Sequence, residues 1–408
     1  MPSKERVDHR TIALLGIETI CVYGAWWYSF GVLLDPILSD TGWSETAVAG
    51  SFSAGVVVIG IGSIFGGRLL DRLGSRPVFL LAATIGGCGL AVTSYATHTA
   101  VFFVGTATSL GAFGALGFYH VTMTAAVRSS PEAPTKAISV LTIWGALASA
   151  IYLPAAAFLV ERTDWRVSIR VLGATAVLSL VVAAFGAPVP PDATPGPRPS
   201  LRDVAALTWR PGRARGFTIT VALAGVSFTT LLVYQVPVMV AAGLPLTTAA
   251  TAAAVRGFCQ LLGRVPLSPL VAKVGSGGAV LAAMGALTAG GLILIVAGTM
   301  PVALLFAVVA GFGIGAWSPL QGIRANELFS SNTLGATMGL FTTVSSTAGA
   351  LGPAMAGFIA DVTGERRWGA VMSAGAALAA AIVFGLTQFR SDEAPETEVS
   401  GATAANNN

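Results

Sequence analysis

Long apolar runs separated by short polar turns make up most of the chain. Each run is about 20 to 28 residues, enough to cross the roughly 30 Å hydrocarbon core of a membrane as a helix. Hydropathy predicts the first six spans at residues 12–34, 47–68, 77–96, 100–125, 137–160 and 166–187. It predicts six more at 216–242, 247–272, 277–298, 301–325, 333–360 and 367–389. The pattern therefore predicts an all-α membrane protein with twelve transmembrane helices.

The polar stretches divide the chain into two bundles of six helices. We expect the N-terminal bundle at 12–187 and the C-terminal bundle at 216–389, with a cytoplasmic N-terminus at 1–11. Residues 188–215 are rich in proline and then basic, which predicts a solvated linker and is compatible with a short amphipathic helix after Pro199. The small, polar tail at 390–408 cannot bury itself, so we expect it to be disordered.

Composition and charge narrow the class of protein. The chain is 54% hydrophobic and only 10% charged, which is too apolar for a soluble protein and leaves no room for a soluble catalytic domain. If the N-terminus is inside, the inner loops hold 16 of the 23 Lys and Arg residues and the outer loops five. This asymmetry predicts a multi-pass protein of the cell membrane with both termini cytoplasmic. The net charge of +4 is then an orientation signal rather than a sign of nucleic-acid binding.

Motifs for cofactor or metal chemistry are missing from the sequence. There is no Gly-Lys dipeptide of a P-loop, no Gly-x-Ser-x-Gly elbow and no His-Glu-x-x-His zinc motif. We expect no cofactor, no metal and no enzymatic activity.

A charged turn from Gly66 to Pro77 lies between the second and third predicted spans. The residues that carry its spacing are Gly67, Asp71, Arg72, Gly74 and Arg76. This spacing resembles the loop between helices two and three of the major facilitator superfamily. The resemblance implies a gating motif whose aspartate helps to latch the inner side shut, facing the N-terminus of the eleventh span.

The two halves of the chain are weakly similar to each other. A shift of about 201 residues places Asp71 to Ser75 on Ala272 to Ser276, and Gly114 on Gly315. Two six-helix pseudo-repeats of this kind imply the major facilitator fold, with a substrate site near the midplane between the halves.

Other segments loosely resemble the monocarboxylate and oxalate/formate branch of the family. They are Phe30 to Asp35, Thr41 to Ser44, Tyr234 to Pro237 and Leu262 to Arg264. That branch often carries a basic residue in helix one or eleven for its anionic substrate, and this sequence has none there.

Charged residues within the predicted spans are the main site candidates, because burying charge in a membrane is costly. Arg256, Gln260 and Arg264 recur every four residues and should share one face of the eighth helix. We predict that they bind substrate, and the alternative for Arg264 is structural anchoring. Glu18 is the candidate for proton or ion coupling. The alternative interpretation is a carboxylate that snorkels or is paired locally.

Further binding candidates are Gln235, His120, Tyr23 and Trp27. For the histidine and the aromatic residues, a packing role is the alternative interpretation.

The sequence favours a secondary transporter, a symporter or antiporter, that moves a small organic molecule by alternating access. The positive interior charge of the spans favours an organic anion such as a monocarboxylate. The alternative is efflux of an amphipathic drug or metabolite. A membrane sensor would be expected to carry an output domain, and an intramembrane enzyme a catalytic cluster. Expected partners are the substrate, H⁺ or a counter-substrate, and membrane lipid, with the protein acting as a monomer.

Overall fold

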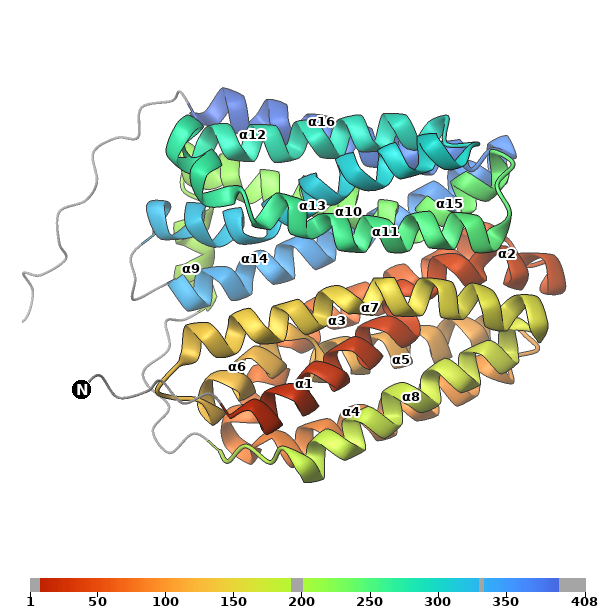
Figure 1. The fold of residues 1–408 in the computed structure, drawn as a ribbon, viewed down its shortest axis with the longest axis horizontal. Helices are drawn as coiled ribbons and strands as arrows, with labels where there is room; N and C mark the ends of the chain where they lie inside the picture. Colours follow the sequence, from red (N-terminus) through yellow and green to blue (C-terminus); the bar gives the residue numbers. More distant parts are fainter. Residues whose placement is uncertain (1–7, 192–200, 330–333, 389–408) are drawn as a thin grey trace, which may run out of the picture.

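The computed structural model describes residues 8–191, 201–329 and 334–388, and these ranges contain helices and no strand. Figure 1 shows two helical bundles stacked one above the other, with most helices running in the same long direction. The first half contains α1 (His9–Val22), η1 (Tyr23–Tyr28), α2 (Phe30–Thr41), α3 (Glu45–Leu73), α4 (Ser75–Ser94), α5 (Thr99–Gly117), α6 (Tyr119–Ser129), α7 (Pro134–Arg162) and α8 (Trp165–Gly186).

The short helix α9 (Leu201–Thr208) precedes the second half. That half contains α10 (Arg213–Ala241), α11 (Leu246–Arg264), α12 (Leu267–Ile295), α13 (Met300–Leu328), α14 (Leu334–Gly349), α15 (Leu351–Thr363) and α16 (Arg367–Gln388). We call the end of the molecule that carries His9 and α9 the linker end, and the opposite end, described below, the Arg366 end. The predicted N-terminal segment and the tail lie mostly outside the described residues.

The predicted membrane protein is confirmed by ten helical segments long and apolar enough to cross a bilayer in the described part of the chain. Two predicted spans are not among the ten. One corresponds to α11, whose apolar run is interrupted by Arg256. The other is divided into α14 and α15 at Ala350. With these two segments the arrangement fits the expected twelve crossings. Exposed Phe65, Leu178 and Leu386 show that the flanks of the bundles remain apolar.

Two predicted spans have a different course in the structure. The first extends from His9 to Thr41 instead of ending at residue 34, and it contains the π-helical turn η1. The fourth is broken at Phe118, whose extended backbone (φ −81°, ψ 178°) separates α5 from α6. Hydropathy did not reveal the π-helical turn or the break because the residues there, Tyr23–Tyr28 and 117–119, are glycine, apolar or aromatic. It ended the first span at residue 34 because polar residues follow, beginning with Asp35.

Backbone geometry supports the repeat seen in the sequence. Gly74 (φ 77°, ψ 178°) and Gly275 (φ 75°, ψ 165°) occupy equivalent positions, and each reverses the chain between two helices. The element α12 is thus two helices joined at Gly275, and its first part continues the eighth span. Pro36 and Pro237, separated by the same offset, both lie inside helices.

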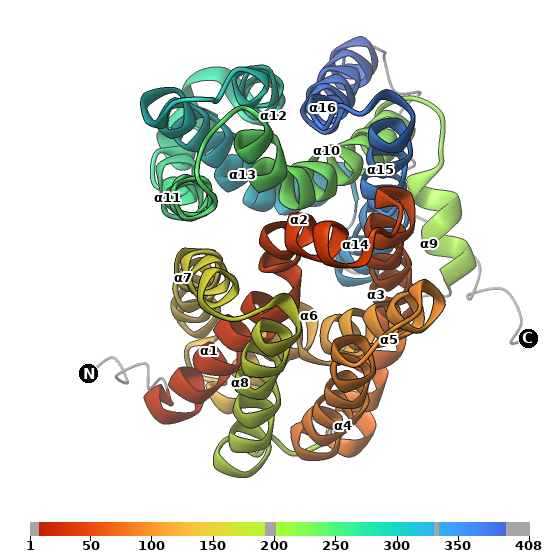
Figure 2. The same cartoon turned by 90° about the vertical axis from the view of Figure 1, so that its right-hand side faces the viewer.

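Small residues allow close helix packing in both halves. Gly89 lies against the backbone of Ser109, and the equivalent Gly290 lies against Ala310. Such contacts replace the hydrophobic driving force that is weak between helices in lipid. Between the halves, α3 packs on α14 and α15, α7 on α11 and α2 on α10, and Figure 2 shows the two bundles meeting along these helices.

We expect Gly74→Ala to destabilise the protein. Its backbone conformation is almost restricted to glycine and costs other residues about 1–3 kcal/mol. An added Cβ would also lie only 2.6 Å from the carbonyl oxygen of Val189. Thermal unfolding in detergent should show a lower midpoint than for Gly67→Ala, the control, where a Cβ meets no atom within 4 Å. Equal midpoints for the two variants would contradict this account of the turn.

Candidate functional site

Arg256 is a buried cation between helices of the second half. It lies on α11 with 1% of its surface exposed. Its Nε donates a hydrogen bond of 2.7 Å to Oε1 of Gln235 on α10. Its Nη1 and Nη2 have no hydrogen-bond partner among the described residues. A buried guanidinium with two unpaired nitrogens is unfavourable, so this arrangement is suited to an anion that completes it.

The predicted stripe on α11 continues toward the linker end. Gln260 is buried, and Arg264 is half-buried with an Nε that has no partner in the described residues. Tyr28 of η1 lies within electrostatic range of both arginines, and Tyr119 lies within range of Arg264. The first half therefore contributes tyrosines to the charged face of the second half, as expected for a site between halves. Tyr28 was not among the predicted site residues, although its place in an aromatic run was a signal.

Tyr23 and Trp27 lie in an aromatic cluster of the first half. The ring of Tyr23 stacks on Phe118 with centroids 3.8 Å apart, and Trp27 meets the same ring edge-on at 5.5 Å. The Tyr23 hydroxyl accepts a hydrogen bond of 3.4 Å from the backbone N–H of Tyr119. These contacts stabilise the break in the fourth span. Between Tyr23 and the arginines lie Tyr119 and Tyr28, whose ring centroids are 5.1 and 6.3 Å from that of Tyr23.

His120 has a local partner at the same break. Its Nε2 lies 2.8 Å from the carbonyl oxygen of Ala115, near the end of α5. A helix end leaves carbonyl groups without intrahelical partners, and the imidazole satisfies one of them. This geometry supports the packing interpretation of His120, and its role as a substrate contact stays a prediction.

Glu18 on α1 is fully buried. Its Oε2 lies 3.4 Å from the hydroxyl of Thr19, and its Oε1 has no hydrogen-bond partner in the described ranges. The structure does not pair it with Arg256. The first span, which extends to Thr41, contains a second carboxylate, Asp35.

The gating motif lies at the linker end. Asp71 forms an ion pair with Arg128 of α6. Ser75 holds the turn to the segment after α8 by accepting a 2.8 Å hydrogen bond from the N–H of Val189. Arg76 lies over the Phe185 ring, 4.4 Å from its centroid. The expected latch to the eleventh span stays a prediction, because residues 330–333, just before α14, lie outside the described part of the chain. Gly67 and the exposed Arg72 complete the motif.

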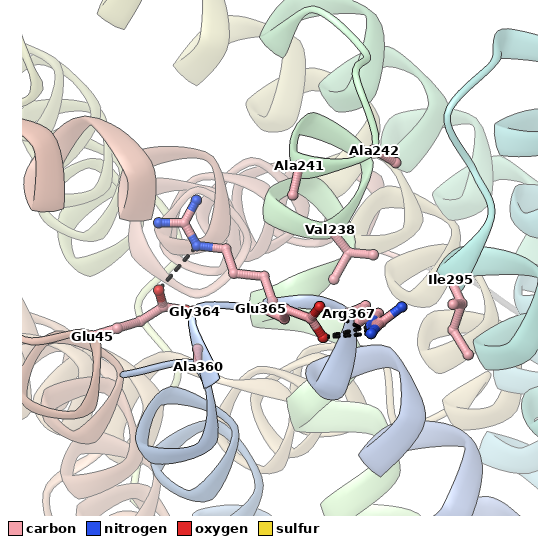
Figure 3. Close-up of a pocket in the computed structure, with 10 residues that line it drawn as sticks. Glu45, Val238, Ala241, Ala242, Ile295, Ala360, Gly364, Glu365 and Arg367 are labelled. Atoms are coloured by element: carbon pink, nitrogen blue, oxygen red, sulfur yellow. Dashed lines mark hydrogen bonds and ion pairs between the residues drawn. The ribbon is translucent and has the colours of Figure 1, made fainter. Parts of the chain in front are cut away.

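A second charged cluster, which the sequence did not predict, closes the opposite end. Arg366 follows α15 and forms ion pairs with Asp35 of α2 at 2.6 Å and Glu45 of α3 at 3.0 Å. The Nε of Arg366 donates the hydrogen bond to Glu45, whereas Figure 3 shows Arg367 paired with the neighbouring Glu365. Burial lowers the pKa of Arg366, but the two carboxylates raise it more, so the net shift is upward. This cluster defines the Arg366 end and joins the two halves there.

Asp361 adds a further link between the halves at the Arg366 end. Its carboxylate accepts hydrogen bonds of 2.8 Å from the N–H groups of both Glu45 and Thr46, and one of 2.5 Å from the Thr46 hydroxyl. These N–H groups belong to the first turn of α3, where a negative charge is favourable. A residue of the second half thus caps a helix of the first.

Two cavities of about 550 and 640 Å³ adjoin Arg366. Glu45, Glu365 and Arg367 line the first, and Asp35 and Glu161 line the second. Arg366 lines both cavities, whereas Arg256 lines neither.

The family model described as Major Facilitator Superfamily matches residues 15–353 and 218–406 of the chain. The chain is 26% identical over 349 residues to monocarboxylate transporter 13 of Rattus norvegicus, covering 83% of this chain and 79% of that protein. It is 28% identical over 351 residues to monocarboxylate transporter 11 of Homo sapiens, covering 81% and 71%.

Solved structures show the same fold. The nucleoside transporter NupG superposes with a TM-score of 0.78 at 13% identity, covering 93% of this chain and 99% of that one. A bacterial homologue of the human lysosomal transporter Spinster, inward-facing and occupied, gives a TM-score of 0.72 at 15% identity, covering 93% and 96%.

We expect Arg366→Gln to weaken the contact between the two halves at the Arg366 end. Losing a charge-assisted hydrogen bond costs about 1.5–3 kcal/mol. This changes the ratio of molecules in which the two halves are apart at the Arg366 end to molecules in which they are in contact there by roughly ten- to a hundredfold. Spin labels at Ser39 on α2 and Thr363 on α15, in a background without native cysteines, should show more long distances in this variant. Arg367→Gln is the matched control, because Arg367 pairs within its own loop. An unchanged distance distribution in Arg366→Gln would exclude a closing role for the cluster.

Proposed function

Because the chain belongs to the major facilitator superfamily of membrane transporters, we propose that it carries a small organic anion, such as a monocarboxylate, by alternating access. The observation that carries this proposal is that two guanidinium nitrogens of buried Arg256 have no partner in the described part of the chain. The similarity to proteins named monocarboxylate transporters is consistent with the same substrate class.

The geometry of Arg256 favours a carboxylate. Gln235 occupies Nε and thereby fixes the plane of the guanidinium. The two Nη groups remain as a fork that matches both oxygens of a carboxylate, and such bidentate pairs are stronger away from water. Gln260 and Arg264 on the same face would contact or attract the anion from the linker end.

The aromatic cluster of Tyr23, Trp27 and Phe118 favours a second candidate, efflux of an amphipathic drug or metabolite. Aromatic faces suit a large, weakly charged substrate. However, these rings are packed against one another. In addition, an amphipathic substrate without negative charge would give Arg256 no partner. We therefore place the anion first.

Orientation follows from the charge asymmetry of the loops. We propose a cell-membrane protein whose linker end, with both termini, faces the cytoplasm and whose Arg366 end faces outward. In that orientation Arg366, Asp35 and Glu45 form an outer closure, and a substrate bound at Arg256 would exchange with the cytoplasmic side.

Binding measurements on the purified protein test the substrate class. We expect a short-chain carboxylate to bind more tightly than its neutral amide. We expect Arg256→Gln to lower the carboxylate affinity at least tenfold, since a charge-assisted bond contributes about 1.5–3 kcal/mol. Arg256→Lys should recover part of it, because lysine keeps the charge without the fork.

Arg324→Gln is the control for this experiment. Arg324 is also buried, but it forms an ion pair with Glu327 at 2.6 Å. Its removal should therefore leave the affinity for the anion unchanged. If Arg256→Gln binds the carboxylate like the wild type, or if the amide binds equally well, the efflux proposal takes precedence.

Cysteine labelling tests the orientation. A cysteine at Ser200 should react with an impermeant maleimide only after the cytoplasmic side is exposed, whereas a cysteine at Thr363 should react in intact cells. The reverse pattern would invert the proposed topology.

A further inference from the structure

We propose that α9 and the segment that follows it, residues 209–215, bind anionic phospholipid headgroups at the membrane surface. We call these two elements the linker-end surface. It contains none of the candidate substrate residues around Arg256. Only the choice of leaflet, the cytoplasmic one, rests on the proposed function.

The helix α9 lies across the transmembrane helices rather than along them. Figure 2 looks close to the direction of the spans, and there α9 is seen from the side at the periphery of the molecule. It packs on α10 and α14. A short helix in this position lies parallel to the membrane plane, where the spans leave the bilayer, as interfacial helices do.

One face of α9 is anchored to the second half. Val204 and Thr208, four residues apart, are buried, and Leu207 between them is half-buried. The hydroxyl of Thr218 on α10 donates a 2.9 Å hydrogen bond to the carbonyl oxygen of Thr208. The helix is therefore a fixed part of the bundle, and its other face is presented outward.

The outward face of α9 and its end carry Arg202, Ala206 and Trp209. All three are exposed, and they recur every three or four positions, so they share one side of the helix. Trp209 has 56% of its surface exposed. An indole ring is well placed at the level of lipid headgroups, because its ring is apolar and its N–H can reach water.

A second arginine is held beside this tryptophan. Gly212, with φ at 96°, reverses the chain between α9 and α10. The Nε of Arg215 donates a 3.2 Å hydrogen bond to the carbonyl oxygen of Trp209, and its guanidinium carbon lies 6.0 Å from the centroid of the Trp209 ring. A guanidinium held in this way can present its Nη groups to a phosphate, which it binds bidentately.

The charge of the linker-end surface suits an anionic partner. Four arginines and one aspartate lie between residues 201 and 215, a net charge of +3. The cytoplasmic leaflet carries anionic lipids and attracts basic segments that lie next to a membrane span. An acidic segment of a soluble protein would have the same charge complementarity, so the position of the surface decides between the two.

The linker-end surface borders the apolar flank of the bundle. A Cβ on Gly216, the residue after Arg215, would be 2.1 Å from the hydroxyl oxygen of Thr387, near the end of α16. The neighbouring Leu386 has 70% of its surface exposed. An exposed leucine here indicates that the apolar flank reaches the level of Arg215, and this boundary between apolar and basic surface favours a lipid as the partner.

Quenching by spin-labelled lipids tests the contact. A fluorophore on Ala206→Cys, in a full chain without native cysteines, reports lipid close to the outward face of α9. In nanodiscs with equal mole fractions, we expect spin-labelled phosphatidylglycerol to quench the fluorophore more strongly than spin-labelled phosphatidylcholine. Equal quenching by the two lipids, or quenching by neither, would overturn the proposal.

Arginine substitutions test the contribution of charge. We expect Arg202→Gln to lower the preference for phosphatidylglycerol about fivefold, which corresponds to about 1 kcal/mol. The double variant with Arg215→Gln should bind the two lipids almost equally. The matched control is Arg162→Gln with Arg170→Gln, which removes two exposed arginines that lie over aromatic rings on other helices. The control should keep the wild-type preference, and a preference retained in the first double variant would overturn the proposal.

The tryptophan and the source of the phosphate are tested in the same nanodiscs. Trp209→Ala should weaken quenching by both lipids, because the ring contributes apolar contact whatever the headgroup charge. Unchanged quenching would contradict its role in the linker-end surface. If excess sn-glycerol 3-phosphate removes the preference, the surface binds free phosphate, and if soluble polyglutamate displaces the lipid, it binds acidic protein. Either result would overturn the proposal, and we expect neither.

These measurements contain no transport substrate, so they do not depend on the class of molecule that the chain carries. Nanodiscs expose both faces of the protein, so lipid binding is detected whichever way the chain is oriented. The cysteine at Ser200 then decides the leaflet. A reversed topology would move the linker-end surface to the other leaflet and leave its lipid preference unchanged.

Discussion

The hydrocarbon core of a membrane offers no hydrogen bonds, so every polar group within the bundles must find its partner in the protein or in a ligand. Most groups in this structure comply. His120 satisfies a carbonyl at a helix break, Asp361 caps α3, and Asp71 pairs with Arg128. Some buried polar atoms of the described residues have no partner, among them atoms of Trp26, Thr106 and Tyr234. Arg256 and Glu18 differ from these because they are the fully buried charged side chains that form no ion pair with a described residue.

These two exceptions have opposite charge and lie in opposite halves. Arg256 is presented by α11 of the second half and Glu18 by α1 of the first, with the tyrosines of η1 and α6 between them. A guanidinium cannot lose its charge in the membrane, so under the proposed function an anion neutralises it. A carboxyl group can instead be neutral by binding a proton. The two side chains therefore need different partners.

The helical architecture could be predicted from the sequence, because the length of each apolar run and the residues of the repeated turn are both local signals. Hydropathy located the spans, and the offset that relates Gly74 to Gly275 appeared in the backbone geometry. It was also sufficient to single out Arg256, since an arginine deep in an apolar run is visible without a structure. The pairing of Arg366 with Asp35 and Glu45 was not predictable, because it joins residues more than 300 positions apart that each look like ordinary charges at helix ends. The break at Phe118 was hidden for a different reason, because its residues are as apolar as their neighbours.

The helix α3 contacts the second half from its first turn to its middle. Its first turn is capped by Asp361, Ser53 accepts a 3.1 Å hydrogen bond from the N–H of Ala354, and the Gly60 carbonyl accepts one of 3.2 Å from Thr343. With 29 residues and a rise of 1.5 Å per residue, α3 is about 43 Å long. The central contacts can act as a fulcrum: a tilt of about 10° around them would move each tip by about 4 Å in opposite directions. One rigid rod would then make opening of one face and closing of the other a single mechanical event.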